Sequence, residues 1–277
     1  MPDPLQIQGM FPYKDGLAVF TTINTDRNSI GIIPIESTYL ESPYCIQLST
    51  SYWKGTSPID MASTDEFLLV VCDGKRYIYE FPSEDADDPS KRIKVLPHDN
   101  QPATLCISTD KSHKNVVVGF AYGTITSGAV VMSLPDYAQL YCFDCRNRGI
   151  PRGFDFTSDS QYFNLLMYSK QMVTAESASG DVDRAELPIP SNYDCMCAIY
   201  VQGQQQTDDV LVACKNRNEG TSAIYRYVWD GKNKVYFSAG TILDGIDVNG
   251  IRNISITRDG GIANIKSKRE VEFYKIV

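Results

Sequence analysis

Histidine and tryptophan are both scarce in this sequence. Only two of the 277 residues are histidines, His98 and His113, and only two are tryptophans. Both histidines lie in polar stretches (LPHDNQP and DKSHKNV), which we interpret as solvated loops. A Ser-His-Asp triad needs a histidine held between a serine and a carboxylate, and no pattern here points to one. We therefore predict no catalytic residue and expect that the protein is not an enzyme.

Long apolar segments are also absent. No apolar run approaches the roughly 18 residues that indicate a transmembrane helix. The N-terminal residues MPDPLQ lack the basic and apolar regions of a secretory signal. We expect a cytoplasmic protein, with the nucleus and the periphery of endomembranes as alternatives.

Basic residues are outnumbered by acidic ones. The chain has 26 Lys and Arg against 34 Asp and Glu, and its formal net charge is −8. Proteins that bind nucleic acid usually carry a basic stripe that displaces counterions from phosphate, and this sequence has none on the scale of a domain. We expect no nucleic-acid partner.

What the sequence has instead is typical of strands and turns. Long runs of Ala, Leu, Glu and Lys are missing, whereas there are 19 Gly, 14 Pro and 17 Tyr. Most of the eight cysteines lie inside apolar, strand-like runs, for example Cys72 and Cys106. Free cysteines in such places behave as small buried apolar residues, as expected in a reducing compartment.

Two cysteine pairs have spacings compatible with zinc, Cys142 with Cys145 and Cys195 with Cys197. In a continuous strand Cys142 and Cys145 would diverge, whereas Cys195 and Cys197 would share a face inside an apolar run. Packing in the core is the favoured interpretation. The acidic run 83–89 (SEDADDP) lacks the glycine and spaced glutamate of a calcium loop. We predict no metal and no cofactor.

A repeat of about 48 residues runs along the chain. Six similar apolar runs begin 51, 48, 46, 48 and 52 residues apart, which is close to the length of a propeller blade. They are GLAVFTT (16–22), FLLVVCD (67–73), NVVVGFA (115–121), QYFNLLMY (161–168), DVLVACK (209–215) and GIANIKS (261–267).

Alternating segments flank these runs. Four of the runs follow a segment in which alternating apolar residues lead to Ser or Thr and then to an Asp near the turn, as in TLCISTDKS (104–112). These short polar side chains suit a tight hairpin, because they can bind the backbone of the turn. A third strand is predicted after most runs, at 29–35, 76–81, 128–134, 222–229 and 270–276, and a fourth at 44–49, 92–97, 139–143, 184–189 and 235–240.

These units predict an all-β fold, a β-propeller of six four-stranded blades, with seven as the alternative count. We expect one domain over 1–277, with blades at 4–54, 55–100, 101–148, 149–192, 193–248 and 249–277. The last unit has no evident fourth strand. This leaves three alternatives: the propeller ring closes poorly, the segment LQIQGMF (5–11) serves the last blade instead of the first, or the unpaired outer edge of the last blade accepts a strand from a partner.

The repeated units resemble those of WD-repeat and WD-like propellers over nearly the whole chain. The segment Val228-Trp229-Asp230-Gly231 places a WD dipeptide at the end of a third strand, where that family has it. The other units lack the dipeptide, and none has the family's Gly-His pair. This resemblance implies a protein-binding scaffold.

A narrower resemblance is to the phosphoinositide-binding propellers of autophagy. That family has a Phe-Arg-Arg-Gly motif between an outer strand and the next blade, where this chain reads FDCRNRG (143–149) without adjacent arginines. The resemblance implies an anion or lipid contact at Arg146, Arg148 and Arg152, because arginine presents a two-pronged donor to phosphate. The alternative is that these are scattered surface charges. The chain is also similar to propellers of endosomal and vacuolar tethering subunits.

Three functions remain open. The first is a non-catalytic scaffold for protein–protein interaction, a subunit of a larger assembly such as a coat or tether. The second is a propeller that binds membrane phosphoinositide. The third is a hydrolase with a metal among inward-facing polar residues, for which Asp155 and Asp194 are the main candidates on otherwise apolar inner strands. Tyrosine-rich segments such as Tyr225-Arg226-Tyr227 suit either core packing or an interface.

Overall fold

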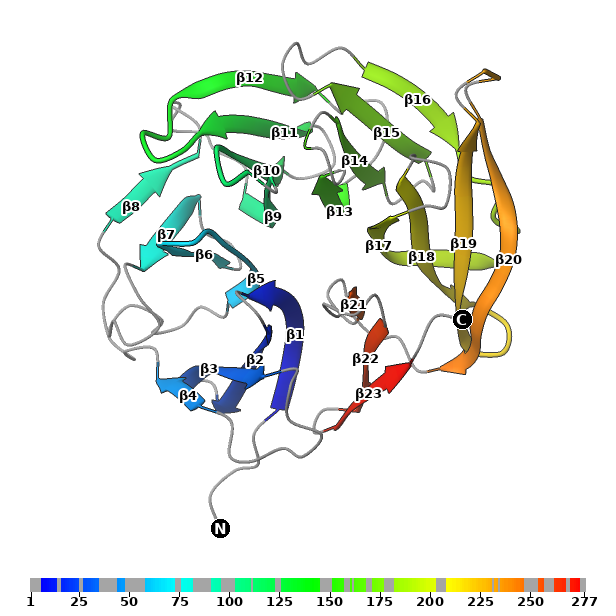
Figure 1. Cartoon of the computed structure of the whole chain (residues 1–277), viewed down its shortest axis with the longest axis horizontal. Coiled ribbons are helices and arrows are strands. Elements are labelled where there is room, and N and C mark those ends of the chain that lie inside the picture. Colours follow the sequence, from blue (N-terminus) through cyan, green and yellow to red (C-terminus); the bar gives the residue numbers. More distant parts are fainter. Residues whose placement is uncertain are drawn as a thin grey trace. The chain divides into compact units, whose positions relative to one another are not determined.

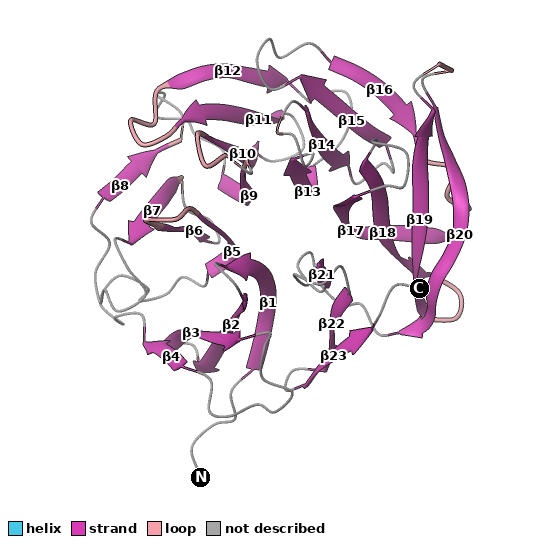
Figure 2. Ribbon diagram, viewed as in Figure 1, coloured by secondary structure: helices cyan, strands magenta, loops and turns pink. Residues whose placement is uncertain are grey.

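The computed structural model contains strands, turns and loops. It describes residues 6–13, 16–24, 27–34, 44–47, 58–72, 76–81, 91–95, 103–110, 112–122, 126–144, 151–156, 160, 162–167, 171–176, 182–202, 208–230, 232–233, 235–246, 254–256, 262–267 and 270–274. Within these residues every regular element is a β-strand (Figure 2). The described residues include no helix of the length and apolarity needed to cross a membrane. The predicted all-β class is confirmed.

The chain divides into two compact units, one made of 1–105 and 252–277 and the other of 106–251. The first unit holds three sheets whose strands follow chain order (Figure 1). They are β1 (Gln6–Tyr13), β2 (Gly16–Asn24), β3 (Arg27–Pro34) and β4 (Tyr44–Gln47); β5 (Pro58–Ser63), β6 (Leu68–Cys72), β7 (Tyr77–Phe81) and β8 (Lys91–Lys94); and β21 (Ile254–Ile256), β22 (Ile262–Ser267) and β23 (Glu270–Tyr274).

In the described residues, the second unit holds three four-stranded sheets. In both units the strands of each sheet are antiparallel and follow chain order. Strand β9 begins shortly before the boundary between the units. The sheets are β9 (Ala103–Thr109), β10 (Asn115–Tyr122), β11 (Thr126–Ser133) and β12 (Gln139–Asp144); β13 (Pro151–Phe156), β14 (Tyr162–Met167), β15 (Gln171–Glu176) and β16 (Val182–Glu186); and β17 (Tyr193–Gln202), β18 (Asp208–Asn216), β19 (Ser222–Asp230) and β20 (Val235–Ile246).

The six apolar runs of the repeat all form the second strand of a sheet. The six sheets also fall within the six expected repeat ranges. The strand β15 (Gln171–Glu176) was not predicted. The segment 5–11 contributes to β1, which pairs with β2, so the idea that it serves the last sheet is wrong. Within the first unit β1 also lies against β21 and β22 without pairing with them.

The second strands β6, β10 and β18 have buried residues on both faces, and the outer strands β12 and β20 are mostly exposed. Every residue of β6 is buried, as are Val116–Val118 of β10 and Leu211–Cys214 of β18. Burying one such Val or Leu side chain contributes about 1.5–3 kcal/mol. In contrast, only one residue of the outer strand β12 is buried. This gradient explains why the inner runs are continuously apolar while outer strands alternate.

The predicted Ser/Thr-and-Asp hairpins use their side chains to complete the turn. Asp110 Oδ1 accepts hydrogen bonds from the backbone N–H of Lys114 (2.7 Å) and Asn115 (3.1 Å). Its Oδ2 accepts from Ser112 Oγ (2.8 Å) and Asn115 Nδ2 (3.0 Å). Asp110 is only 2% exposed, so these bonds replace the water that a carboxylate otherwise needs.

A β-bulge recurs on the first strand of four sheets. The register shifts between Ile7 and Gly9, Pro58 and Asp60, Pro151 and Gly153, and Cys195 and Cys197. A bulge adds one residue to one strand, which bends it and increases its twist. It also reverses which face the following residues occupy.

Candidate functional site

The polar residues considered for catalysis belong to three different sheets. His113 lies in the β9–β10 turn, where its backbone N–H donates to the Asp110 carbonyl (3.0 Å). Asp155, on β13, accepts a hydrogen bond from the backbone N–H of Phe156 (3.0 Å). Asp194 is bound to Arg217 at the end of another sheet. His98 and the acidic run 83–89 lie outside the described residues.

One buried acid on an inner strand escaped the sequence analysis. Asp60 of β5 is fully buried, and its Oδ1 accepts a hydrogen bond from the backbone N–H of Met61 (2.9 Å). The described residues contain no group of three or more His, Cys, Asp or Glu side chains arranged to hold a metal.

The bulge in β17 changes the expected geometry of its cysteines. Cys195 lies opposite Cys214, whereas Cys197 lies opposite Ala213, with Met196 as the extra residue between them. Cys195 and Cys197 therefore lie on opposite faces of the sheet, and the prediction that they share a face is wrong. Both are buried, as is usual for cysteines that pack in a core.

The remaining thiols and the arginines of the lipid hypothesis are placed only in part. Cys142 of β12 is exposed, and Cys145 lies outside the described residues. Arg146 and Arg148 also lie outside them. The backbone of Arg152 is at the register shift of β13. The phosphoinositide contact stays a prediction.

A cluster of polar and aromatic side chains lies at one end of sheet β17–β20. We call it the Tyr193 cluster: Asn192, Tyr193, Asn216 and Tyr225. Asn216 Nδ2 donates to Tyr193 Oη (3.4 Å), and Asn192 Nδ2 donates to Asn216 Oδ1 (3.4 Å). The rings of Tyr193 and Tyr225 meet edge to face, with centroids 5.9 Å apart at 90°.

The backbone holds this cluster in place. The N–H of Arg217 donates to the Asn192 carbonyl (2.9 Å), which ties the turn before β17 to the turn after β18. Gly220, with φ of 71°, lies in the left-handed region, and its N–H donates to the Asn216 carbonyl (2.9 Å). Tyr193 and Tyr225 are therefore held in place, partly buried against the core of this sheet.

Burial and a hydrogen bond to Tyr193 raise the pKa of Tyr225 well above its ordinary value. Its hydroxyl therefore stays protonated to a higher pH than that of an exposed tyrosine. At the same end of the sheet, Asp194 follows Tyr193 on β17 and so projects from the other face. Arg217 Nε and Nη2 donate to Asp194 Oδ1 at 2.9 and 2.5 Å. The Arg217 and Asp194 side chains are 54% and 37% exposed. A pair this exposed contributes little to stability.

The segment Tyr225-Arg226-Tyr227 divides between core and surface. Tyr227 is 1% exposed and packs in a core cluster with Val210, Val212 and Tyr236. Arg226 donates from Nε to Asp209 Oδ2 (2.6 Å), and its Nη2 contacts the same oxygen. Only Tyr225 of the three belongs to the surface cluster.

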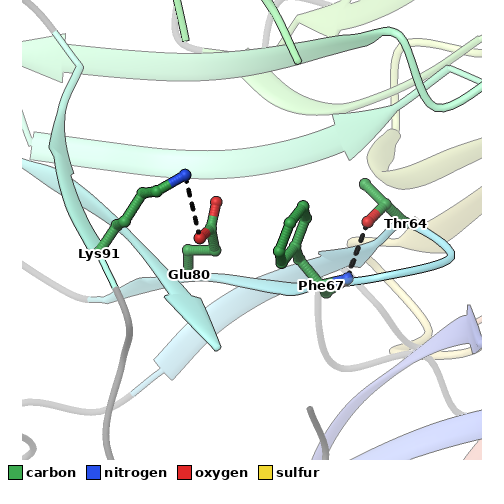
Figure 3. A network of polar contacts seen from close by, with 4 residues as sticks. All are labelled: Thr64, Phe67, Glu80 and Lys91. Carbon is green, nitrogen blue, oxygen red and sulfur yellow. Dashed lines mark hydrogen bonds and ion pairs between the residues drawn. The ribbon is translucent and has the colours of Figure 1, made fainter. Parts of the chain in front are cut away.

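The sheet β5–β8 of the first unit carries a different charged group (Figure 3). Lys91 of β8 lies opposite Glu80 of β7, with Nζ 3.6 Å from Oε1 and 5.8 Å from the centre of the Phe67 ring. Thr64 Oγ1 accepts the Phe67 N–H (2.9 Å), which closes the β5–β6 hairpin. On the other face, the Arg92 guanidinium lies 4.3 Å from the centre of the Tyr77 ring. These contacts hold the outer strand β8 against its own sheet, and we do not assign a ligand site to them.

No family model and no curated protein matches this chain. Solved structures do match. A chain of the Kuenenia stuttgartiensis hydrazine synthase has a TM-score of 0.64 at 12% identity, over 95% of this chain and 73% of that one. A chain of the mitotic checkpoint complex has a TM-score of 0.60 at 9% identity, with the same coverages. The WD40 β-propeller domain of Doa1 has a TM-score of 0.53 at 12% identity, over 99% of this chain and 94% of that one.

At such low identities the likenesses show the fold alone, which is a β-propeller. The predicted propeller fold is therefore confirmed, while the number of blades stays a prediction.

Proposed function

We propose that this propeller is a non-catalytic scaffold that binds other proteins, with its six sheets as blades. We further propose that the Tyr193 cluster, together with Arg217 and Asp194, forms part of its contact surface. The observation that carries the proposal is a pair of partly buried tyrosines, held by a hydrogen bond and a ring contact, at the same end of the sheet as an exposed arginine. Tyr and Arg are enriched among the residues that dominate binding energy at protein interfaces.

The fixed geometry favours binding. A tyrosine that is already held by Asn216 and by a neighbouring ring loses little conformational freedom when a partner covers it. The ring supplies apolar area, and the hydroxyl supplies a hydrogen bond. The exposed Arg217–Asp194 pair contributes little to the stability of the fold. At an interface, either side chain can form an ion pair with a charged residue of the bound protein instead.

The comparisons support this proposal in a general way. One similar structure is a WD40 propeller domain and another is a protein complex. Membership of a larger assembly is part of our proposal for this chain. Hydrolysis has less support, because the carboxylates of Asp60 and Asp155 each accept a hydrogen bond from the backbone N–H of the next residue.

The test is quantitative affinity purification of the full chain from its native source. Two variants with the same change of charge are compared, Arg217→Asp in the surface and Lys232→Asp in the exposed β19–β20 turn of the same sheet. We expect Arg217→Asp to remove at least one stoichiometric partner and Lys232→Asp to retain it. The proposal fails if the wild-type chain has no stoichiometric partner, or if both variants retain the same partners.

A further inference from the structure

Two cysteines lie directly opposite each other on neighbouring strands. Cys195 of β17 is the Cα partner of Cys214 of β18 in the antiparallel register. Opposed residues of an antiparallel pair project from the same face, and their Cα atoms lie about 4.5 or 5.5 Å apart. A disulfide needs Cα atoms about 4.4–6.8 Å apart. The register therefore places two thiols where one bond can join them without a rearrangement of the strands.

The packing agrees with a shared face. Cys195 and Cys214 belong to one core cluster, together with Val212 and Tyr227, and both are present as thiols. A negative charge on either sulfur raises the pKa of Tyr227, so both sulfurs lie within electrostatic reach of that hydroxyl. Cys197 is also buried, but it lies opposite Ala213 and on the other face. The fold thus selects one partner for Cys214.

The bulge in β17 gives this pair room to adjust. Met196, the residue after Cys195, is the extra residue of the bulge, and a bulge interrupts the ladder at that point. Opposed Cβ atoms are about 4.5–5.5 Å apart in a regular pair, whereas a disulfide needs about 3.5–4.5 Å. Cys195 therefore has to move slightly toward Cys214, and a disulfide held under such strain is more easily reduced again.

Access to the pair is from the end of the sheet. Cys195 is 4% exposed and Cys214 is 0% exposed. The Tyr193 and Asn216 pair lies two residues further out on the same face, at the beginning of β17. Segments near the end of an element open locally at a lower free energy than the core does. A small neutral oxidant such as hydrogen peroxide can reach the thiols through such openings.

We propose that Cys195 and Cys214 form an oxidative modification site, a dithiol that hydroperoxides convert reversibly into a disulfide between β17 and β18. One thiolate attacks a peroxide oxygen, the O–O bond breaks, and water and a sulfenic acid result. The second thiol attacks that sulfur, the S–O bond breaks, and a second water leaves as the S–S bond forms. Two electrons pass from the two sulfurs to the peroxide. An external dithiol reverses the reaction by thiol–disulfide exchange.

The bond joins the strands directly beneath the Tyr193 cluster. Tyr193 and Asn216, which share a hydrogen bond of 3.4 Å, are each two residues from one of the cysteines. A covalent link at this point keeps the ends of β17 and β18 together and opposes their opening. The inference does not rest on the proposed function, because it needs only the two thiols and the oxidant.

The test maps the disulfide in the full chain. The folded protein is treated with hydrogen peroxide, its remaining thiols are alkylated, and it is cut by a protease that cleaves before Asp. This cleavage separates 194–207, which carries Cys195 and Cys197, from 209–229, which carries Cys214. We expect these two peptides to be joined by a disulfide that dithiothreitol separates. Fragment spectra of the joined peptides assign the bond to Cys195 or to Cys197.

Three variants and one unfolded sample complete the test. Cys195→Ala and Cys214→Ala are each expected to remove the cross-link. Cys197→Ala is the matched control, because it makes the same change at an equally buried cysteine on the other face, and it should retain the cross-link. Oxidation of the wild type in urea should give bonds to Cys197 as well, since the register no longer selects the partner.

Two results would overturn the proposal. The first is a folded wild-type chain whose two peptides stay separate after oxidation. The second is a cross-link that uses Cys197 as often in the folded chain as in urea. Both are measured on the wild type, so the test holds even where a cysteine variant fails to fold.

Discussion

The sheets β5–β8 and β17–β20 end in outer strands of opposite character. Strand β8 is short and cationic, and its side chains are engaged by Glu80 on one face and Tyr77 on the other. Strand β20 is long, is uncharged over most of its length, and exposes Val235 and Phe237. Both complete the same antiparallel meander, so the sheet itself does not require either pattern. The difference shows that the side chains of the fourth strand, and not the meander, set the character of the outer edge.

Each of the two sheets buries one acidic side chain beside a cation, Glu80 beside Lys91 and Asp209 beside Arg226. Removing each acid tests how much the burial of its cation matters. Asp209 is 4% exposed at its side chain and its partner Arg226 24%, whereas Lys91, the partner of the buried Glu80, is 52% exposed. Asp209→Ala leaves a largely buried guanidinium and should cost about 3–5 kcal/mol in unfolding free energy. Glu80→Ala leaves an ammonium that reaches water and should cost about 1 kcal/mol. Urea denaturation followed by fluorescence measures both, and equal losses would contradict the comparison.

Alkaline pH should affect the two sheets unequally. Burial raises the pKa of Tyr227 well above its ordinary value, and burial also raises the pKa of Tyr79 while the nearby Arg92 lowers it in part. A raised pKa in the folded state gives stability that is complete below about pH 10 and is lost as pH rises further. The loss is at most about 1.4 kcal/mol per pH unit for each group.

We therefore expect Tyr227→Phe to flatten the fall in stability above pH 10 more than Tyr79→Phe does. Urea denaturation at several pH values between about 8 and 11 measures this difference. A larger effect of Tyr79→Phe would show that Arg92 does not offset the burial of Tyr79.

The smallest effect is expected at the exposed residues of the two outer strands. Arg92→Ala removes the contact with the Tyr77 ring and should cost about 0.5–1 kcal/mol. Phe237→Ala removes an exposed side chain and should change the stability of the monomer by less than about 0.5 kcal/mol. Thermal unfolding of the two variants and the wild type compares the two losses. A larger loss for Phe237→Ala would mean that this ring packs within its own sheet.

Much of the fold could be predicted because its signals are local. The apolar runs that form β6, β10 and β18 are continuous, since both of their faces are buried, and such runs are visible without knowing their neighbours. The Ser/Thr-and-Asp turns were also predictable, because Asp110 binds backbone groups within five residues of itself. Strand β15 (QMVTAE) was missed, because its polar and small residues become a strand only through pairing with β14 and β16.

The candidate surface could not be predicted in the same way. Tyr193 and Asn216 are 23 residues apart in the sequence and meet only because β17 and β18 pair in one register. The tyrosines of 225–227 were noted in the sequence, but their alternation alone does not say which one is covered. The face of Cys197 was predicted wrongly for a related reason, since a bulge has no clear sequence signal and reverses every face that follows it.

The sequence by itself determined the all-β class, the repeat of about 48 residues and the positions of most strands, because burial on one or two faces imposes its pattern on consecutive residues. Only the tertiary structure decided which tyrosines are covered, which acids have a cation beside them, and that Val235 and Phe237 of β20 are exposed. Those properties depend on register, bulges and packing between strands, and these are set by residues far apart in the chain.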